Sequence, residues 1–407
     1  MDRPREPDFA SSAFKADPYV HWMLLRDLAP VHSVRLHNGS LAWLVSRYDD
    51  AVSVLSDPRF VKDALKTKGD GASKPPWLPG PLRALSRNML DLDEADHRRL
   101  RNLVQKAFTP RVVEEMRPRI ERIATDLLDA IERRGNNAAE LITEYAAPIP
   151  VTVIAELLGV AEEDRRKFYR WSNQIVAADS SAWHKIWAIP AAFAFVLFLR
   201  RLIRQRRSAL RDDLLSRLIE VQEEGNRLSA DELLSMCFLL LIAGHETTVN
   251  LIGNGVLALL ENPEQMQRLR DEPALIAPAV EEILRYCSPV QLATERYATA
   301  AVMVGEVTIP RGALVHVVLA SANRDEKTFS CPADFQPDRQ PNRHLAFGHG
   351  IHYCLGAPLA RLEGQIAIRL LLERFREIHL AGDTSRLRWR RGLVLRGLES
   401  LHVVVSR

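Results

Sequence analysis

Apolar residues recur three and four positions apart along most of the chain, as they do in amphipathic helices. The spacing predicts helices over residues 18–28, 48–55, 94–131 with a break near 109, 149–158, 162–177, 190–222, 229–261 and, as a pair, 264–286. Runs of β-branched and apolar residues predict short strands at 41–45, within 300–318 and at 401–405. The chain is therefore expected to be mainly α with small β-sheets, an α+β fold class.

The longest of these helices is expected over about residues 229–261. Ser229 and Glu232 have the spacing of a capping box at its start, and Pro263 ends it. At about 1.5 Å per residue the helix would extend over about 50 Å, enough to cross the whole molecule.

Two polar stretches interrupt the helical pattern. Residues 1–17 are expected to be a polar tail, without the apolar segment of a signal peptide. Residues 62–90 are rich in Lys, Gly and Pro and are expected to be a long loop. Length alone suggests two or three domains. The sequence contains no Ser/Gly linker, low-complexity tract or repeat, however, so residues 1–407 are expected to form a single domain.

Composition narrows the class of protein. The 407 residues are 47% hydrophobic and 26% charged, as in soluble globular proteins, and the net charge of +3 does not favour nucleic-acid binding. The four cysteines lie far apart without a CxxC pair, which argues against zinc or disulfides and for a reducing cytosol. The longest apolar stretch, residues 188–199, contains Pro190 and is shorter than the roughly 20 residues that span a bilayer. A soluble, cytoplasmic protein is expected.

One cysteine lies in the most informative segment of the chain, residues 347–357. Cys354 is flanked by glycines and followed by Pro358, which suits the first turn of a helix. A thiolate here can be the axial ligand of a haem iron. Glycines let backbone N–H groups approach the sulfur, and the helix dipole stabilises its negative charge. The alternative is a small buried hydrophobe, the usual state of a lone cysteine in an intracellular protein.

The spacing Phe-Gly-x-Gly-x-His-x-Cys-x-Gly, from Phe347 to Gly356, resembles the haem-binding signature of the cytochrome P-450 superfamily in its soluble bacterial form. The resemblance implies the cytochrome P-450 fold, with the central helix at 229–261 over the haem. It also implies haem b (iron protoporphyrin IX) as the cofactor. Cys354 would be the axial thiolate and metal ligand, with Phe347 and Gly348 beside it.

A second motif lies in the middle of the long helix, at residues 243–248. Oxygen activation at a haem needs two protons, and an acid beside a hydroxyl can relay them. The motif resembles the acid–alcohol pair of the family, with Glu246 as the catalytic acid in place of the commoner Asp and Thr247 as the hydroxyl. Gly244 costs a helix about 1 kcal/mol relative to alanine, which invites a packing or functional reason. The alternative is a flexible spot on a core helix, with the threonine hydroxyls bonded to carbonyls one turn earlier.

Glu282 and Arg285 stand three residues apart and share one face of a helix. On a surface they would form an ion pair of little energetic weight. The resemblance instead implies a buried pair joined by an arginine from a later segment, identified as Arg339. Such a triad would be structural and not catalytic.

Four cationic residues are candidates for binding the haem propionates. His97 and Arg101 lie at i and i+4 on a helix, so they point in one direction. By resemblance, Arg296 and His352 complete the set. Contacts between cations and carboxylates are among the stronger hydrogen bonds, although each of these residues taken alone would be an ordinary surface group.

By resemblance, residues 62–90 and about 171–200 form the substrate-access region. Apolar residues crowd positions 183–199, and arginines follow directly. This pattern fits a buried helix, a hydrophobic entrance for substrate, or a weak contact with an anionic membrane surface. The candidates for lining the pocket, which are mostly apolar, are Leu239, Ala243, Val290 and Leu292.

The implied reaction activates O₂ with two electrons and two protons and hydroxylates or epoxidises a hydrophobic small molecule (a lipid, terpenoid or polyketide-like compound). No flavin or iron–sulfur domain is attached, so electrons would come from a separate ferredoxin and ferredoxin reductase. The basic residues that would steer an acidic ferredoxin are Arg98, Arg99, Lys106, Arg111 and Arg361. A monomer without a nucleic-acid partner or transmembrane segment is expected.

Two other functions stay open. A non-catalytic haem-binding sensor has no need of proton delivery, so Glu246 and Thr247 argue against it. A peroxide-driven haem-thiolate oxidase could also dispense with this pair and is the lesser alternative.

Overall fold

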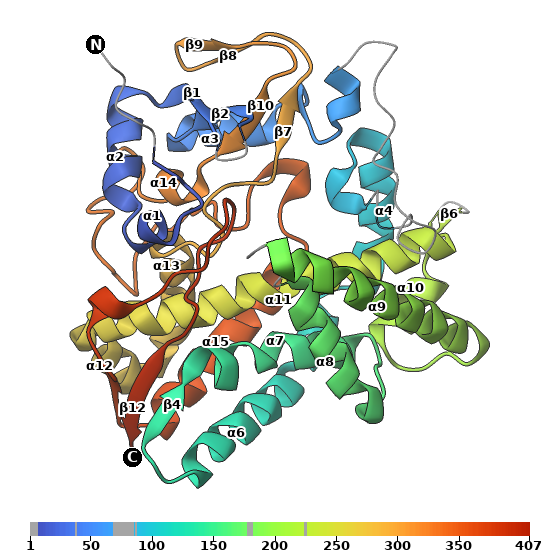
Figure 1. Cartoon of the computed structure of the whole chain (residues 1–407), viewed down its shortest axis with the longest axis vertical. Helices are drawn as coiled ribbons and strands as arrows, with labels where there is room; N and C mark the ends of the chain where they lie inside the picture. Colours follow the sequence, from blue (N-terminus) through green and yellow to red (C-terminus); the bar gives the residue numbers. More distant parts are fainter. Residues whose placement is uncertain (1–6, 37–38, 68–84, 86–87, 177–181, 224–225) are drawn as a thin grey trace.

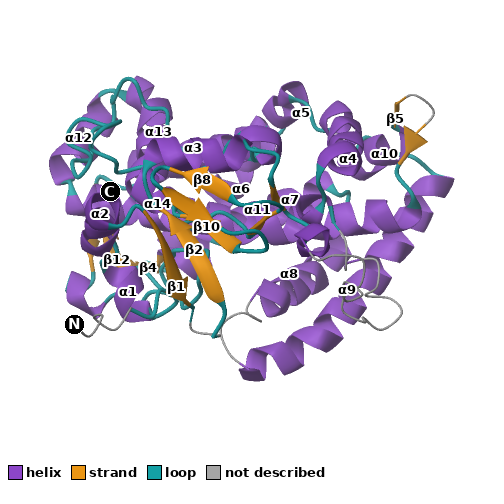
Figure 2. Cartoon of the chain, turned by 90° about the horizontal axis from the view of Figure 1, so that it is seen from above, coloured by secondary structure: helices purple, strands orange, loops and turns teal. Residues whose placement is uncertain are grey.

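The computed structural model describes residues 7–36, 39–67, 85, 88–176, 182–223 and 226–407. Helices dominate, and small sheets lie to one side of them (Figures 1 and 2), so the expected mainly α fold with small sheets is confirmed. The helices are α1 Ser12–Ala16, α2 Tyr19–Leu28, α3 Tyr48–Ser56, α4 Glu94–Ala107, α5 Pro110–Glu115, α6 Arg117–Arg133, α7 Pro148–Leu157, α8 Glu162–Val176, α9 Ala182–Ser208, α10 Leu214–Glu220, α11 Ala230–Glu261, α12 Pro263–Asp271, α13 Ile276–Tyr286, α14 Leu319–Ala322 and α15 Ala357–Arg374.

The strands are short, and several of them pair residues far apart in the sequence. They are β1 Val31–Arg35, β2 Leu41–Val45, β3 Phe60–Val61, β4 Ala138–Glu140, β5 Gln222–Glu223, β6 Asn226–Arg227, β7 Arg296–Ala298, β8 Val302–Val304, β9 Val307–Ile309, β10 Leu314–Val317, β11 Glu377–Leu380 and β12 His402–Ser406. The larger sheet has the order β1-β2-β10-β7-β3, and β10 runs parallel to β2. Figure 2 shows β1, β2 and β10 side by side. This sheet brings β7, which begins at Arg296, next to β3.

Helix α11 crosses the middle of the molecule, as the sequence predicts (Figure 1). Its capping box forms: the Ser229 side chain accepts from the Glu232 amide, and the Glu232 carboxylate accepts from the Ser229 amide. Helix α11 is long and apolar enough to cross a membrane, but more than half of its most apolar window is buried against the rest of the chain. It is packed as a core helix.

The beginning of the chain differs from the expected polar tail over 1–17. Ser11 caps α1, and Phe9 and Phe14 are buried with Trp22 in a core cluster of their own. The rings of Phe9 and Trp22 stack with centroids 5.4 Å apart. Lys15 is fully buried. The polar composition of this segment predicts exposure to solvent, but its two aromatic residues, Phe9 and Phe14, are enough to anchor it to the core.

Several helix and strand boundaries also differ from those that the spacing of apolar residues predicts. The helix expected over 190–222 is two helices, because α9 ends at Ser208 and Asp213 caps α10. The segment 94–131 divides into α4, α5 and α6, with Thr109 capping α5. Strands β1, β4 and β11 were not predicted. Most of the loop expected over 62–90 lies outside the described residues.

Candidate active site

The loop around Cys354 is held by its own backbone. The Cys354 amide donates to the Phe347 carbonyl at 2.9 Å, and helix α15 begins three residues later. Gly348 and Gly350 have φ of +73° and +72°, values that residues with a side chain rarely adopt. A Cβ at Gly350 would also lie 2.6 Å from the Leu55 carbonyl oxygen. The glycines of the motif are therefore required by the path of the backbone.

The surroundings of the Cys354 sulfur act on its pKa in opposite directions. The residue keeps accessible surface, but protein atoms crowd the sulfur, and this desolvation raises the pKa of the thiol. The amides of Gly356 and Ala357 and the guanidinium groups of Arg101 and Arg361 act in the opposite direction. The first turn of α15 supplies N–H groups to the sulfur, as the sequence predicts.

Phe347 is fixed beneath the guanidinium of Arg361, which lies 4.5 Å from the ring centroid. Arg361 in turn donates to both carboxylate oxygens of Glu281, at 2.7 and 2.8 Å. Arg361 was expected to belong to a ferredoxin-docking surface. The structure shows that it also ties the cysteine loop to α13.

Five cationic side chains gather beside the cysteine loop. They are Lys62, His97, Arg101, Arg296 and His352. The rings of His97 and His352 are 4.3 Å apart at their centroids. The Nη2 of Arg101 donates to the Tyr353 carbonyl at 2.8 Å. The four sequence candidates are thus brought together from α4, β7 and the cysteine loop. Lys62 was missed.

The pKa values of all five groups are lowered. Burial is the largest cause in each case, because it disfavours the charged form. It lowers the pKa of Lys62 to about 7 and that of Arg296 to about 10. Nearby positive charges lower the pKa of His352 further, to about 2. Burial therefore disfavours the charged forms of these groups, and an anion placed beside them would stabilise positive charge in the cluster.

Two nitrogen atoms in this cluster are buried and have no hydrogen-bond partner within the described parts of the chain: Nε of Arg296 and Nε2 of His352. Orphaned buried nitrogen atoms among uncompensated cations suit a ligand that carries carboxylates. Haem presents two propionates, so the residues fit this cofactor.

The middle of α11 keeps accessible surface on several sides, including a stripe of three residues. Leu239, Ala243 and Thr247 lie four residues apart and are partly buried or exposed, whereas most of the helix beyond them is buried. The Thr247 hydroxyl donates to the Ala243 carbonyl at 2.7 Å, the back-bonding that the structural alternative expects. Glu246 Oε1 lies 3.6 Å from Nη1 of Arg390. The sequence did not indicate this arginine.

A second acid, also missed, lies on α15 close to the same turn of α11. Glu363 is 2% exposed, and its side chain hydrogen-bonds with Thr248. Burial raises the pKa of Glu363 to about 8, so this carboxyl keeps its proton at neutral pH. A lone Glu in an amphipathic helix gives no sign of this in the sequence, because its burial depends on contact with α11.

Glu282, Arg285 and Arg339 meet away from solvent, so the alternative of a surface ion pair is wrong. Arg285 Nε and Nη2 each lie 2.7 Å from a Glu282 oxygen, and Arg339 Nε lies 3.1 Å from Glu282 Oε1. None of the three side chains is more than 4% exposed. Arg285 also donates to the carbonyls of Asn323 and Pro332. The triad joins α13 to the segment that precedes the cysteine loop.

The four candidates for lining a substrate pocket differ in how much accessible surface they keep. Leu239 and Ala243 lie on the accessible stripe of α11, and Val290 is partly buried. Leu292 is 1% exposed and packs in the N-terminal core cluster. The packing of Leu292 gives it a structural role.

Of the apolar stretch expected to be an entrance, Phe195, Val196 and Leu199 are buried. Ile189 and Leu197 are each 55% exposed. One side of the described part of α9 is therefore buried, and side chains at 181–188 lie outside the described set.

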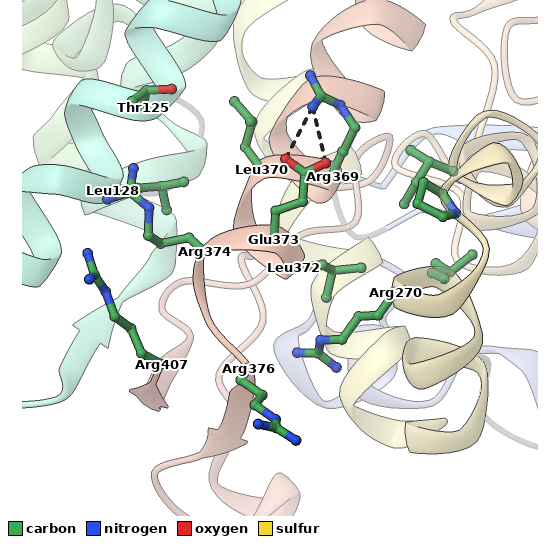
Figure 3. A pocket seen from close by; sticks show the side chains of 13 residues that line it. Thr125, Leu128, Arg270, Arg369, Leu370, Leu372, Glu373, Arg374, Arg376 and Arg407 are labelled. Carbon is green, nitrogen blue, oxygen red and sulfur yellow. Dashed lines mark hydrogen bonds and ion pairs between the residues drawn. The ribbon is translucent and has the colours of Figure 1, made fainter.

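A separate cleft of about 620 Å³ lies at the far end of α15, between α6 and α12 (Figure 3). Its lining contains none of the candidate site residues. Its arginines are Arg270, Arg369, Arg374, Arg376 and Arg407. Carboxylates hold several of them: Arg369 pairs with Glu121 and Glu373, Arg374 with Asp129 and Glu132, and Arg407 with Glu132.

Known proteins resemble this chain along nearly its full length. The family model for cytochrome P450 matches residues 40–396. Cytochrome P450 107B1 of Saccharopolyspora erythraea is 46% identical over 398 residues, which is 96% of each chain, and 6-deoxyerythronolide B hydroxylase of the same organism is 43% identical over 98% of each. The structure of the Bacillus subtilis 168 bacillaene polyketide synthase cytochrome P450 PksS superposes with a TM-score of 0.91, at 41% identity, covering 99% of this chain and 100% of that one. The chain belongs to the cytochrome P450 family and is a monooxygenase whose cofactor is haem, with the thiolate of Cys354 as axial ligand.

Proposed function

We propose that this enzyme hydroxylates or epoxidises a polyketide-derived compound and takes its electrons from a separate ferredoxin and ferredoxin reductase. The observation that carries a hydrophobic substrate is the accessible stripe of α11, where Leu239 and Ala243 offer apolar contacts beside Thr247. Full-length relatives support the polyketide class, since their printed names include a polyketide biosynthesis cytochrome P450, a 6-deoxyerythronolide B hydroxylase and a mycinamicin IV hydroxylase/epoxidase. Lipids and terpenoids are the less favoured classes.

The haem, with its thiolate ligand, supplies the chemistry of O₂ activation, and the chain supplies binding, orientation and protons. Arg101, Arg296 and the two histidines would hold the propionates by charge-assisted hydrogen bonds. The Gly356 and Ala357 amides stabilise negative charge on the Cys354 sulfur. The triad of Glu282, Arg285 and Arg339 keeps the segment before the loop in place.

Protons reach the reacting oxygen through α11. The Thr247 hydroxyl donates to the Ala243 carbonyl at rest; to deliver a proton it would turn away from this carbonyl, give up its hydroxyl proton and take another from an acid. Glu246 is the acid that recharges this hydroxyl, and its ion pair with Arg390 keeps it beside the site. Glu363 stores a further proton at the Thr248 hydroxyl, one residue along the helix. A haem-binding sensor would need none of these groups.

A spectral titration of the purified holoenzyme tests the substrate class. Macrolactones, terpenoids and fatty acids are added in turn, and loss of the axial water shifts the haem absorption without any redox partner. The expected result is tight binding of a macrolactone and weaker binding of the other classes. A preference for fatty acids or terpenoids would overturn the polyketide assignment.

Replacing Thr247 by alanine tests the proton relay. With a surrogate ferredoxin pair and dodecanoic acid as the probe, T247A should release more of its electrons as hydrogen peroxide than the wild type does, because protons arrive too slowly at the reacting oxygen. Thr308→Ala, at an exposed position on β9, is the matched control. Equal peroxide yields in T247A and the wild type would remove the relay role.

Docking of a ferredoxin and the oligomeric state belong to the same proposal. Arg98 and Arg111 are exposed, and Arg99 is paired with Glu232. Arg98→Glu should raise the KM for ferredoxin at low salt and leave substrate binding unchanged.

We propose that the enzyme is a monomer and cytoplasmic.

A further inference from the structure

Residues 8–16 at the beginning of the chain hold a loop near its end, residues 389–398, here named the C-terminal loop. The two ends of this loop are paired through Trp389 and Leu398. Along the two segments, the Gly392 amide donates to the Ala10 carbonyl at 3.0 Å, and the Trp389 amide donates to the Ser12 hydroxyl at 3.2 Å. Figure 1 shows the red C-terminal loop beside α1.

Lys15 is the centre of this contact. Its side chain is fully buried, and Nζ lies 2.9 Å from Gln291 Oε1, 3.3 Å from the Leu393 carbonyl and 2.6 Å from the Leu395 carbonyl. An ammonium group has three donors, so these three acceptors match it. Arg396 completes the contact by donating to the Lys15 carbonyl at 2.8 Å. A lysine buried to this degree is rare unless its hydrogen bonds are satisfied.

The C-terminal loop that Lys15 holds also packs on α11. Asn254 Nδ2 donates to the Arg396 carbonyl at 2.9 Å. A side chain at Gly397 would collide with the amide of Asn250. At the other side of the loop, Arg390 reaches Glu246. The loop therefore connects the buried lysine of α1 to the acid of α11.

We propose that Lys15 is a positioning residue for Glu246: it holds the C-terminal loop on α11 so that Arg390 stays at the Glu246 carboxylate. This inference rests on the proposed role of Glu246 in proton delivery. Lys15 itself touches neither substrate nor haem, and it acts through Arg390.

The contact should depend on pH. The charged groups that face Lys15 are Arg396 from the C-terminal loop and Glu246 from α11. Burial is the largest cause that lowers the pKa of Lys15, to about 7; Arg396 lowers it further and Glu246 opposes this. Below this pH the ammonium satisfies all three acceptors. Above it the neutral amine has two donors, so one acceptor loses its bond and the loop is held less firmly.

The test compares Lys15→Met and Lys15→Gln with the wild-type holoenzyme between pH 6 and 9. Hydrogen-exchange protection is measured in residues 389–398, and the peroxide fraction is measured with dodecanoic acid and a surrogate ferredoxin pair. In K15M, protection at pH 6 should fall about tenfold, as for the loss of hydrogen bonds to a charged group. The peroxide fraction should rise with it, while haem content and the carbon monoxide band stay unchanged. Lys167→Met, on an exposed lysine of α8, is the control.

The glutamine variant separates charge from bonding. Its amide donates two hydrogen bonds at every pH, so K15Q should resemble the wild type above pH 7 and show no change across it. Arg390→Gln should raise the peroxide fraction without loss of protection in residues 389–398.

A wild-type peroxide fraction in K15M at pH 6 would overturn the proposal. Glu246→Gln is measured in parallel. If E246Q raises the peroxide fraction and K15M does not, the inference on Lys15 fails alone. If E246Q also behaves as the wild type, the proposed proton delivery fails.

Discussion

Positive charge is concentrated at both ends of α15, but it is compensated at one end and not at the other. In the cleft at the C-terminal end, Arg369, Arg374 and Arg407 each have a carboxylate partner from the chain itself. Beside the cysteine loop, burial lowers the pKa values of Lys62, Arg296 and His352, and the carboxylates near Lys62 and Arg296 do not offset the loss of solvent. The second cluster therefore needs an anion from outside the chain, and the first does not.

The pKa values of two arginines, one from each region, differ in the same sense. The hydrogen bond to Asp129 is the largest cause that raises the pKa of Arg374, whereas burial lowers the pKa of Arg296 to about 10. An arginine count alone would not separate the two regions. The balance between desolvation and a partner charge distinguishes a binding site for an anionic cofactor from a network of structural ion pairs.

Removing the ligand of the iron should have the largest effect. Cys354→Ala should abolish the long-wavelength band of the reduced carbon monoxide complex, because that position of the band depends on thiolate ligation. Cys331→Ala, at an exposed cysteine, should keep the full band. A long-wavelength band that persisted in C354A would exclude this residue as the ligand.

The two ends of α15 can be compared directly through one arginine from each. Arg296→Leu should speed haem transfer to apomyoglobin about tenfold to a hundredfold, since a buried charge-assisted contact to a propionate is lost. Arg376→Leu in the C-terminal cleft should leave the transfer rate at the wild-type value. Equal rates for the two variants would break the distinction drawn here.

Glu363, in the middle of α15, is a buried acid, so burial should raise its pKa where it lowers the pKa values of the buried bases. Its folded-state pKa is raised to about 8 from 4.5, so its contribution to stability is present below about pH 4.5 and lost as the pH rises through 8. Glu363→Gln should therefore flatten the fall in Tm between pH 5 and 9, with a gain on the order of 3 °C at pH 9. Parallel Tm curves for variant and wild type would show that the carboxyl ionises freely.

The smallest effect is expected in the compensated cleft. Arg374→Met should lower the free energy of unfolding by less than about 1 kcal/mol in urea titrations, because exposed ion pairs contribute little. Its haem-transfer rate should equal that of the wild type. A loss of haem in R374M would mean that the two ends of α15 are coupled.

The features that were predicted correctly from the sequence depend on contacts between residues a few positions apart in the chain. The capping box of α11 and the glycine positions of the cysteine loop require contacts over a few residues, and both are present. The gathering of the cation cluster required the family pattern as well, because Arg296 lies far from His97 in sequence.

Residues that were missed owe their roles to contacts between distant segments. Lys62 bonds to the Thr294 carbonyl, and Arg390 reaches back to α11. Strand β4 was missed because three residues carry no measurable period. The polar tail was misjudged for a related reason: Phe9 and Phe14 become core residues only against Trp22 and the sheet.

The pairing of β3 with β7 and of α1 with the C-terminal loop limits how early the chain can fold while it is being synthesised. Chains grow from the N-terminus, yet Lys15 must wait for Leu395, and His97 must wait for His352. A nascent chain that has reached the end of α11 has the acid–alcohol pair but lacks the thiol and two of the propionate donors. Haem retention on the ribosome should therefore begin only once Cys354 has emerged, and chains arrested earlier should not hold the cofactor.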